Sequence, residues 1–420
     1  MIDCKAYVPA VRHRQQGREA VRRVVQFAIG LGLTATAFGC FAQTKAVPNA
    51  MRQSALSLEQ QGSNTDAETA WRTILKSHSA DAEAYAHIAL LEARQGHYKE
   101  AIPLYRKALS LGPQIPSVRL NLGLALFKSG ELKESIVVFN PLLATVPPSS
   151  PTAQQLRTLI GMAHYGLAQY AEAAPYLKAA AANDSQNVPL LDVLAHCYLW
   201  SKQYDLVLDV YHQMLTLDPD SAEADMLAGE ALDQMKDNAG AVKMFRAAIQ
   251  ANPKEPDVHF GLGYLLWTQK QYAEAAQEFH AELQNDPNHA QSMLYLADSD
   301  IQMNEISTAR PLLERVLKLN PSLPLTYLDL GIVDSEAGRN EDALRELEKA
   351  EKLIPNDVNV HWRLGRLYRS MGKNDQAKIE LNKASSLNKA VDDALYQKIS
   401  NGNAHPPPSQ EPSNAPADKP

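Results

Sequence analysis

The chain has 420 residues, of which 45% are hydrophobic and 21% charged, and its net charge at neutral pH is −7. This composition is typical of a folded chain, and its acidic balance disfavours nucleic acid as a partner, because phosphate contacts require cations. Of the cysteines Cys4, Cys40 and Cys197, only the last lies beyond residue 42, so residues 43–420 cannot form an intrachain disulfide.

The first 42 residues are predicted to be an export signal. A stretch rich in arginine precedes Val24–Ala42, which carries no charge, and this order is typical of a secretory signal. We expect cleavage after Ala42, which would place the remaining chain in the periplasm or outside the cell. Two alternatives stay open. About 19 uncharged residues can span a bilayer as an uncleaved anchor, and Cys40 is a candidate for lipidation. In either case the membrane would be reached only through residues 1–42.

From residue 48 onward the dominant feature is an internal repeat with a nearly constant period. A small residue recurs at intervals of 34, with one interval of 38, and a bulky side chain follows each small residue at a fixed distance in the chain. The small residues are Ala55, Ala89, Gly123, Gly161, Ala195, Gly229, Gly263, Ala297, Gly331 and Gly365. The bulky residues are Trp71, Tyr105, Phe139, Leu177, Tyr211, Phe245, Phe279, Leu313, Leu347 and Leu381. Such a period predicts stacked units that bury a core between neighbours.

Each repeat is predicted to be a helical hairpin. In residues 82–115, Tyr85, Ile88 and Ala89 are spaced as on one side of a helix, and Gly96 ends that helix. A second apolar series begins at Ala101 and stops before a glycine and a proline at 112 and 113. Small residues are needed where the two helices cross, because larger side chains would separate their axes.

These positions resemble the tetratricopeptide repeat, with its small residue in the first helix, alanines in the second and a closing proline. The resemblance covers about residues 48–389, with repeats starting near 48, 82, 116, 154, 188, 222, 256, 290, 324 and 358. It implies an all-α, right-handed superhelical solenoid of about ten hairpins. With the predicted signal, the chain is identified as a tetratricopeptide repeat protein of a bacterial exported type.

Two segments follow the repeats. Residues 390–400 are predicted to form one amphipathic helix that caps the last repeat, with Val391, Leu395 and Ile399 on one side. Residues 401–420 are rich in proline and small polar residues, so we expect them to be disordered.

The repeat pattern is broken in two places. Four extra residues fall near Val146–Thr152, and Pro141 lies inside a predicted second helix, so we expect a local break there. If this break has a function, we expect it to open the groove at repeats three to five. The alternative is that the extra residues are a loop insertion without a role. Glu282 stands where the family usually has alanine, and we expect its side chain to turn outward and to weaken the packing of repeats seven and eight.

No catalytic constellation is found in the sequence. The motifs HExxH, CxxC and GxSxG and a phosphate loop are all missing, and the histidines of the repeats are scattered singly. We therefore expect no enzyme activity, no cofactor and no metal site.

The resemblance implies that the first helices of the repeats line a concave groove. Aromatic and aliphatic side chains on these helices are candidates for peptide binding, because a few apolar anchors supply most of the affinity of such a surface. They are Leu120, Leu124, Phe127, Met162, Tyr165, Leu199, Trp200, Met226, Phe260, Tyr264, Trp267 and Leu294. The alternative is that several of them pack within the solenoid and never meet a ligand.

Charged residues accompany these candidates. Interleaved acidic side chains predict that the middle of the groove prefers an apolar ligand with positive charges. They are Glu223, Glu230, Asp233, Asp257, Asp298 and Asp329. Arg363, Arg366 and Arg369 in the last repeat are candidates for holding a carboxylate, with a solvated basic face as the alternative.

Three functions remain open. The first is a non-catalytic scaffold that binds an extended peptide or a partner helix in the groove. The second is a membrane- or lipid-anchored assembly factor of an envelope or secretion complex. The third is a regulatory subunit of an enzyme carried on another chain.

Overall fold

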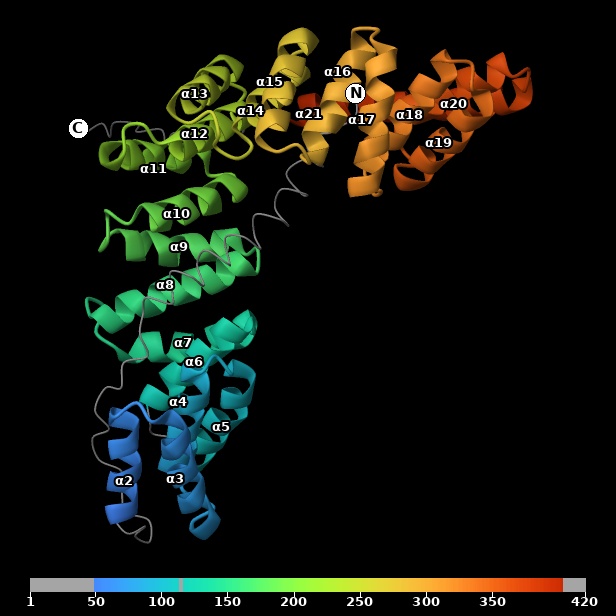
Figure 1. The fold of residues 1–420 in the computed structure, drawn as a ribbon. Coiled ribbons are helices and arrows are strands. Elements are labelled where there is room, and N and C mark those ends of the chain that lie inside the picture. Colours follow the sequence, from blue (N-terminus) through green and yellow to red (C-terminus); the bar gives the residue numbers. More distant parts are fainter. Residues whose placement is uncertain (1–48, 113–115, 403–420) are drawn as a thin grey trace, which may run out of the picture. The chain divides into compact units, whose positions relative to one another are not determined.

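The computed structural model describes residues 49–112 and 116–402, and in that part of the chain it contains twenty α-helices and no strand (Figure 1). The predicted all-α stack of about ten hairpins is confirmed. Residues 1–42 with Cys40, and the tail from residue 403 on, lie outside the described residues. Among the described helices, none is both long and apolar enough to cross a membrane.

The described residues divide into two compact units, one up to Glu255 and one from Pro256 onward. The N-terminal unit has six hairpins: α2 (Asn49–Gln60) with α3 (Asn64–Ser77), α4 (Ala82–Arg94) with α5 (Tyr98–Leu111), α6 (Pro116–Ser129) with α7 (Leu132–Thr145), α8 (Pro151–Gly166) with α9 (Tyr170–Ala181), α10 (Val188–Trp200) with α11 (Tyr204–Leu217), and α12 (Ala222–Gln234) with α13 (Asn238–Ala251). The C-terminal unit has four: α14 (Val258–Thr268) with α15 (Tyr272–Asn285), α16 (Ala290–Gln302) with α17 (Ile306–Leu319), α18 (Pro324–Glu336) with α19 (Asn340–Leu353), and α20 (Val358–Ser370) with α21 (Asn374–Gly402).

The small and bulky residues of the repeat meet where the two helices of a hairpin cross. A Cβ atom added at Gly123 would lie 2.3 Å from the ring of Phe139, and one added at Gly331 would lie 2.5 Å from Leu347. These distances leave no room for a side chain larger than glycine. The predicted pairing of the small residue with the bulky one is therefore confirmed at these crossings.

Several first helices are capped by the side chain that precedes them. Asp81 accepts a hydrogen bond from the amide of Ala84, and Ser221 accepts one from that of Ala224. Such caps satisfy amides that have no partner within the helix. Helix α14 differs, because Asp257 has a left-handed backbone with φ of 66° and its side chain makes no cap.

The missing cap of α14 is supplied by Glu282 from the second helix of the same hairpin. Its carboxylate accepts hydrogen bonds from the amides of Asp257, at 3.2 Å, and Phe260, at 3.1 Å. The side chain of Asp257 is instead paired with His289 Nε2 at 3.0 Å. Glu282 is 2% exposed, so the expectation that it turns outward is wrong. The amides at the start of α14 donate to the buried carboxylate, and this stabilises Glu282 in its inward position.

The four extra residues are accommodated without ending a helix at Pro141. Helix α7 continues through Pro141 to Thr145, a short loop follows, and α8 then begins at Pro151 with Ser150 as its cap. Because proline has no amide hydrogen, Pro141 leaves the carbonyl of Val137 without its helical hydrogen bond. Val137 is 71% exposed, so this part of α7 lies on the solvent side of the helix. Pro141 thus does not end α7, and the expected local break of the superhelix stays a prediction.

The predicted capping helix at 390–400 is not a separate element. These residues belong to α21, which runs without interruption from Asn374 to Gly402. No glycine or proline occurs between residues 374 and 401, so nothing in the sequence ends the second helix of the last repeat. The first two residues of the expected disordered tail, 401 and 402, are likewise the end of α21.

Candidate functional site

The predicted binding residues lie on first helices, but most of the apolar ones are buried. Eight of them are at most 9% exposed, which corrects the expectation of an exposed apolar strip. The eight are Leu124, Phe127, Met162, Tyr165, Leu199, Met226, Phe260 and Leu294. The alternative that such side chains pack within the solenoid therefore describes them better.

The other candidates are more accessible to solvent. Five are partly exposed, namely Leu120, Trp200, Tyr264, Trp267 and Arg363, and two are exposed, namely Arg366 and Arg369. The first helices of successive repeats pack side by side, so a side chain that points toward the next repeat is covered by it. The partly exposed aromatic residues gather in two clusters, one in each unit.

The first group, which we name the Trp200 cluster, contains Tyr165, Tyr170, Asp192, His196 and Trp200 in the N-terminal unit. Trp200 stacks on Tyr165 with 5.7 Å between ring centroids and lies 4.6 Å from Tyr170. The imidazole of His196 is 4.9 Å from the same indole. Three rings from α8, α9 and α10 thus surround one tryptophan.

The Trp200 cluster contains its own cation. His196 Nδ1 is 3.2 Å from a carboxylate oxygen of Asp192, one turn earlier on α10. Burial opposes a charge on His196, but the negative charges of Asp192 and, as a smaller contribution, Glu230 outweigh burial and raise the pKa of His196 to about 9. The ring is therefore an imidazolium at neutral pH, paired within its own helix.

The second group, which we name the Trp267 cluster, lies in the C-terminal unit and contains Tyr264, Trp267, Tyr295 and Asp298. The centroid of Tyr295 is 5.3 Å from that of Tyr264 and 5.0 Å from that of Trp267. The indole Nε1 of Trp267 donates a hydrogen bond of 2.5 Å to Asp298, whose other oxygen accepts a bond of 3.3 Å from Gln302. The three rings of α14 and α16 thus contact one another, and one of them, that of Trp267, binds the carboxylate of Asp298.

Asp329 on α18 is a second carboxylate next to this cluster. It is 1% exposed, and among the described residues neither of its oxygens has a hydrogen-bond partner. Burial raises the pKa of the Asp329 carboxyl well above its ordinary value, the charge of Asp298 raises it further, and Arg363 lowers it. Burial also raises the pKa of Asp298, against its hydrogen bonds. Both groups are unfavourable sites for negative charge unless a cation joins them.

The predicted basic residues lie on α20, at the end of the C-terminal unit. The guanidinium groups of Arg363 and Arg366 lie 5.1 and 4.8 Å from the ring of Trp362, which is 40% exposed. Burial and the neighbouring charge of Arg366 lower the pKa of Arg363. Within the described residues, Arg363 forms no ion pair with Asp298 or Asp329 and acts on them only from a distance.

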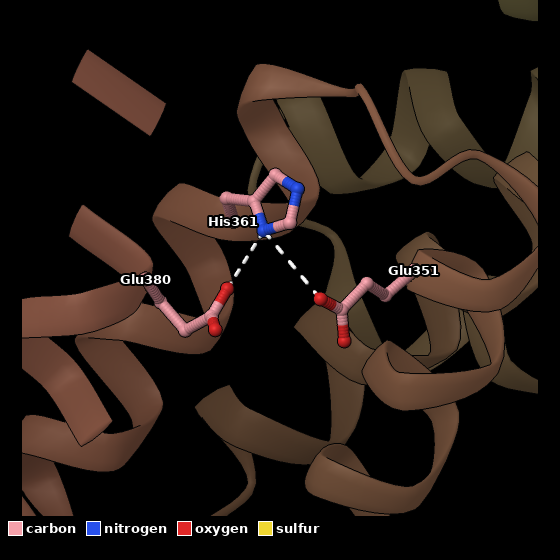
Figure 2. Close-up of side chains that lie close together, drawn as sticks. All are labelled: Glu351, His361 and Glu380. Carbon is pink, nitrogen blue, oxygen red and sulfur yellow. Dashed lines mark hydrogen bonds and ion pairs between the residues drawn. The ribbon is translucent and has the colours of Figure 1, made fainter. Parts of the chain in front are cut away.

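A histidine and two glutamates meet where α19, α20 and α21 pack together (Figure 2). His361 Nδ1 is 2.7 Å from Glu380 and 3.8 Å from Glu351, and its Nε2 lies 2.8 Å from the carbonyl oxygen of Pro355. A metal ion could bind Nδ1 and the two carboxylates, with Pro355 orienting the ring. However, the ammonium of Lys383 already bridges both carboxylates, at 3.1 Å from Glu351 and 2.8 Å from Glu380.

The repeat register favours a structural role for this group. The same pair occurs three repeats earlier, where His259 Nδ1 lies 2.6 Å from Glu278. At both positions a histidine of the first helix and a glutamate of the second therefore join the two helices of one hairpin. We interpret the group at His361 as an ion network that fastens α21 to α19 and α20.

Several members of both clusters were not predicted from the sequence. Tyr170 and Tyr295 were not among the candidates, and neither was the pair of Asp192 and His196. The pair had a readable signal, because a carboxylate and a histidine four residues apart share one face of a helix. No sequence pattern indicates that the carboxylate of Asp329 has no hydrogen-bond partner among the described residues. That property depends on how the side chains of neighbouring helices pack around it.

The helical hairpins match the models of a known protein family. Models described as tetratricopeptide repeat match residues 52–116 and 226–290 in one case, and 92–160, 266–325 and 335–399 in the other. Together the matches span more than half of the chain. The chain belongs to the tetratricopeptide repeat family. Proteins of this family are typically non-catalytic scaffolds that bind other proteins.

Curated relatives are similar over part of their length. The CTR9 homolog of Arabidopsis thaliana is 23% identical over 66% of this chain and 26% of the relative. CDC16 of Saccharomyces cerevisiae, an anaphase-promoting complex subunit, is 24% identical over 58% of this chain and 23% of the relative. Protein bimA of Emericella nidulans is 26% identical over 39% of this chain and 20% of the relative. The chain thus spans about a quarter or less of these proteins.

Solved structures are also similar. PilF of Pseudomonas aeruginosa is 19% identical, with a TM-score of 0.43 over 53% of this chain and 99% of that one. MamA of Desulfovibrio magneticus RS-1 is 19% identical, with a TM-score of 0.37 over 40% of this chain and 96% of that one.

Proposed function

We propose that this chain is a non-catalytic scaffold that binds an extended peptide or a partner helix along the face formed by its first helices. The observation that carries the proposal is the pair of aromatic clusters, one in each unit, whose partly exposed residues Trp200, Tyr264 and Trp267 lie on first helices. Large rings with one covered and one accessible side supply contact area at low cost in side-chain entropy, as binding anchors do. The yeast relative is named as a subunit of a complex, which supports a role inside an assembly.

The test replaces the anchors in each unit separately. We expect Trp200→Ala to weaken capture of partner proteins from an extract of the source cells, and the pair Tyr264→Ala with Trp267→Ala to do the same. Captured proteins are identified by mass spectrometry, and each is then purified and titrated by calorimetry. The matched control is Val137→Ser, which changes an apolar residue, 71% exposed, on the second helix α7.

If both aromatic variants bind purified partners with unchanged Kd, the first-helix face is not the binding surface. Helix content measured by circular dichroism should stay at the level of the unmodified protein in every variant. A loss of helix would assign the effect to folding, and replacement of the tryptophans by phenylalanine would then separate folding from binding.

Export and anchoring are proposals about the N-terminus. The predicted signal at 1–42 would place binding outside the cytoplasm, either in solution or at a membrane. The intact mass of the purified protein distinguishes a start at Gln43, an acylated Cys40 and a retained Met1. A retained, unmodified N-terminus on protein that fractionates with the cytoplasm would contradict export.

A further inference from the structure

We propose that Asp298 and Asp329 receive a basic side chain of the bound partner, lysine or arginine, beside the rings of the Trp267 cluster. The proposal rests on the peptide-binding function proposed above and names the chemistry of one position in the ligand.

The first support is the state of the two carboxylates. Asp298 and Asp329 are 5% and 1% exposed, and the charge of Asp298 disfavours a negative charge on Asp329. Asp298 accepts two neutral hydrogen bonds, whereas Asp329 accepts none among the described residues. Two buried carboxylates with no paired cation are unstable together, and a ligand cation would remove that instability.

The second support is that the neighbouring buried acids of the same unit are paired. Asp334, five residues further along α18 and 2% exposed, forms ion pairs with Arg310 and with Arg339, the latter at 2.8 Å. Asp300 on α16 accepts a hydrogen bond of 2.6 Å from the hydroxyl of Thr308. The absence of a partner is therefore specific to Asp329 and is not a property of buried acids in this unit.

The third support is the combination of rings and charge. The rings of Tyr264 and Trp267 are partly exposed, while the two carboxylates are buried. A lysine or arginine has a long apolar stem and a terminal cation, so its stem can lie along the rings while its charge reaches the carboxylates. A neutral or acidic side chain would leave both carboxylates unpaired.

Arg363 does not fill this role itself. Its charge lowers the pKa of both carboxyls, but it lies over Trp362 and beside Arg366 and forms no ion pair with either acid in the described part of the chain. The charge of Arg363 is shared with a third carboxylate, Glu336, which also acts on it. A basic side chain of the ligand would supply the direct ion pair that neither Asp298 nor Asp329 has in the described part of the chain.

The experiment selects from a random nonapeptide library of L-amino acids on the immobilised full chain. It compares the unmodified protein, Asp329→Asn, and Glu314→Gln as a control that removes one negative charge from the second helix α17. We expect the unmodified protein and the control to select peptides in which one position is enriched in lysine or arginine. Asp329→Asn should still bind peptides but lose that enrichment.

The selected peptide is then compared with a copy that carries norleucine at the enriched position. We expect its Kd to rise by about tenfold on the unmodified protein, as for the loss of one charge-assisted hydrogen bond. On Asp329→Asn it should change by less than about twofold. Whether lysine or arginine is enriched identifies the cation.

Each remaining outcome overturns a stated claim. Peptides selected without a basic position, or enrichment that survives in Asp329→Asn, would refute the carboxylate site and leave peptide binding intact. If the unmodified protein selects no peptide, both this inference and the proposed peptide-binding function are wrong. Circular dichroism of Asp329→Asn verifies that the variant is folded, and Asp329→Leu provides a second variant without a carboxylate.

Discussion

The Trp200 cluster and the Trp267 cluster are both built around a tryptophan of a first helix, but their charged groups are paired differently. His196 in the first and Asp298 in the second occupy the same position of the repeat, three repeats apart. The histidine is paired with Asp192 within its own helix, whereas neither Asp298 nor Asp329, on which the charge of Asp298 acts, has an ion pair among the described residues. The Trp200 cluster thus contains a cation for its carboxylate, and no such ion pair is present in the Trp267 cluster within the same residues. In a repeat protein, different residues at equivalent positions can therefore give two sites of similar backbone structure different charges.

The largest expected effect comes from two aspartates of α18 that differ only in pairing. Replacing Asp334 by Asn breaks ion pairs with arginines that are 36% and 41% exposed, and we expect a loss of about 2 kcal/mol in local stability. Replacing Asp329 by Asn removes an unpaired buried charge, and we expect a gain of about 1 kcal/mol at neutral pH. Hydrogen exchange of the α18 amides in the full chain measures both effects.

The two substitutions are expected to change stability in opposite directions, and this difference tests whether Asp329 lacks a partner. Because the pKa of Asp329 is raised in the fold, the ionised carboxylate destabilises the unit only above the ordinary aspartate range, and the gain from Asp329→Asn should vanish in acid. Destabilisation by both substitutions at neutral pH would mean that Asp329 has a stabilising partner, and the contrast between the clusters would fail.

A smaller effect is expected from the indole of Trp267. Trp267→Phe keeps a ring but removes the donor to Asp298, so we expect a loss of about 1.5 kcal/mol in the stability of α16, measured by hydrogen exchange. The matched control is Trp362→Phe, which changes a tryptophan that is 40% exposed. Equal losses in the two variants would indicate that ring size, not the hydrogen bond, decides the effect.

The smallest expected effect is a pH dependence of the Trp200 cluster. The pKa of His196 is about 9 in the fold and has an ordinary value of 6.5, so its stabilisation is complete below pH 6.5 and is lost as the pH rises through 9. We expect a loss on the order of 1 kcal/mol across that range. Urea unfolding of the full chain at pH 6 and pH 9.5 measures it, with Asp192→Asn as comparison.

In Asp192→Asn the main cause of the raised pKa is gone, so most of the pH dependence should disappear with it. Parallel pH profiles of the two proteins would show that His196 is not held as an imidazolium by Asp192. The Trp267 cluster contains no histidine, and its variants should leave this profile unchanged.

The sequence predicted the hairpins because every repeat carries the same local information. The fit of Gly123 against Phe139 follows from a spacing that can be read along the chain. Burial was predicted less well, since helical periodicity gives the face on which Phe260 or Met226 lies but not how closely the next repeat covers it. Sequence alone could place Asp329 on a first helix. Its lack of a partner follows only from the packing of its neighbours.

The cap that Glu282 provides to α14 has a consequence for exchanging modules of this protein. In six other hairpins, whose first helices are α4, α8, α10, α12, α16 and α20, the side chain of the residue just before the first helix caps it, so such a hairpin carries its own cap wherever it is moved. In the seventh hairpin the cap comes from 25 residues downstream, and it must travel together with Asp257. A recombinant chimera joined anywhere between residues 257 and 282 would separate the two, and a consensus alanine at 282 would remove the cap. This hairpin can be transplanted only as one indivisible piece.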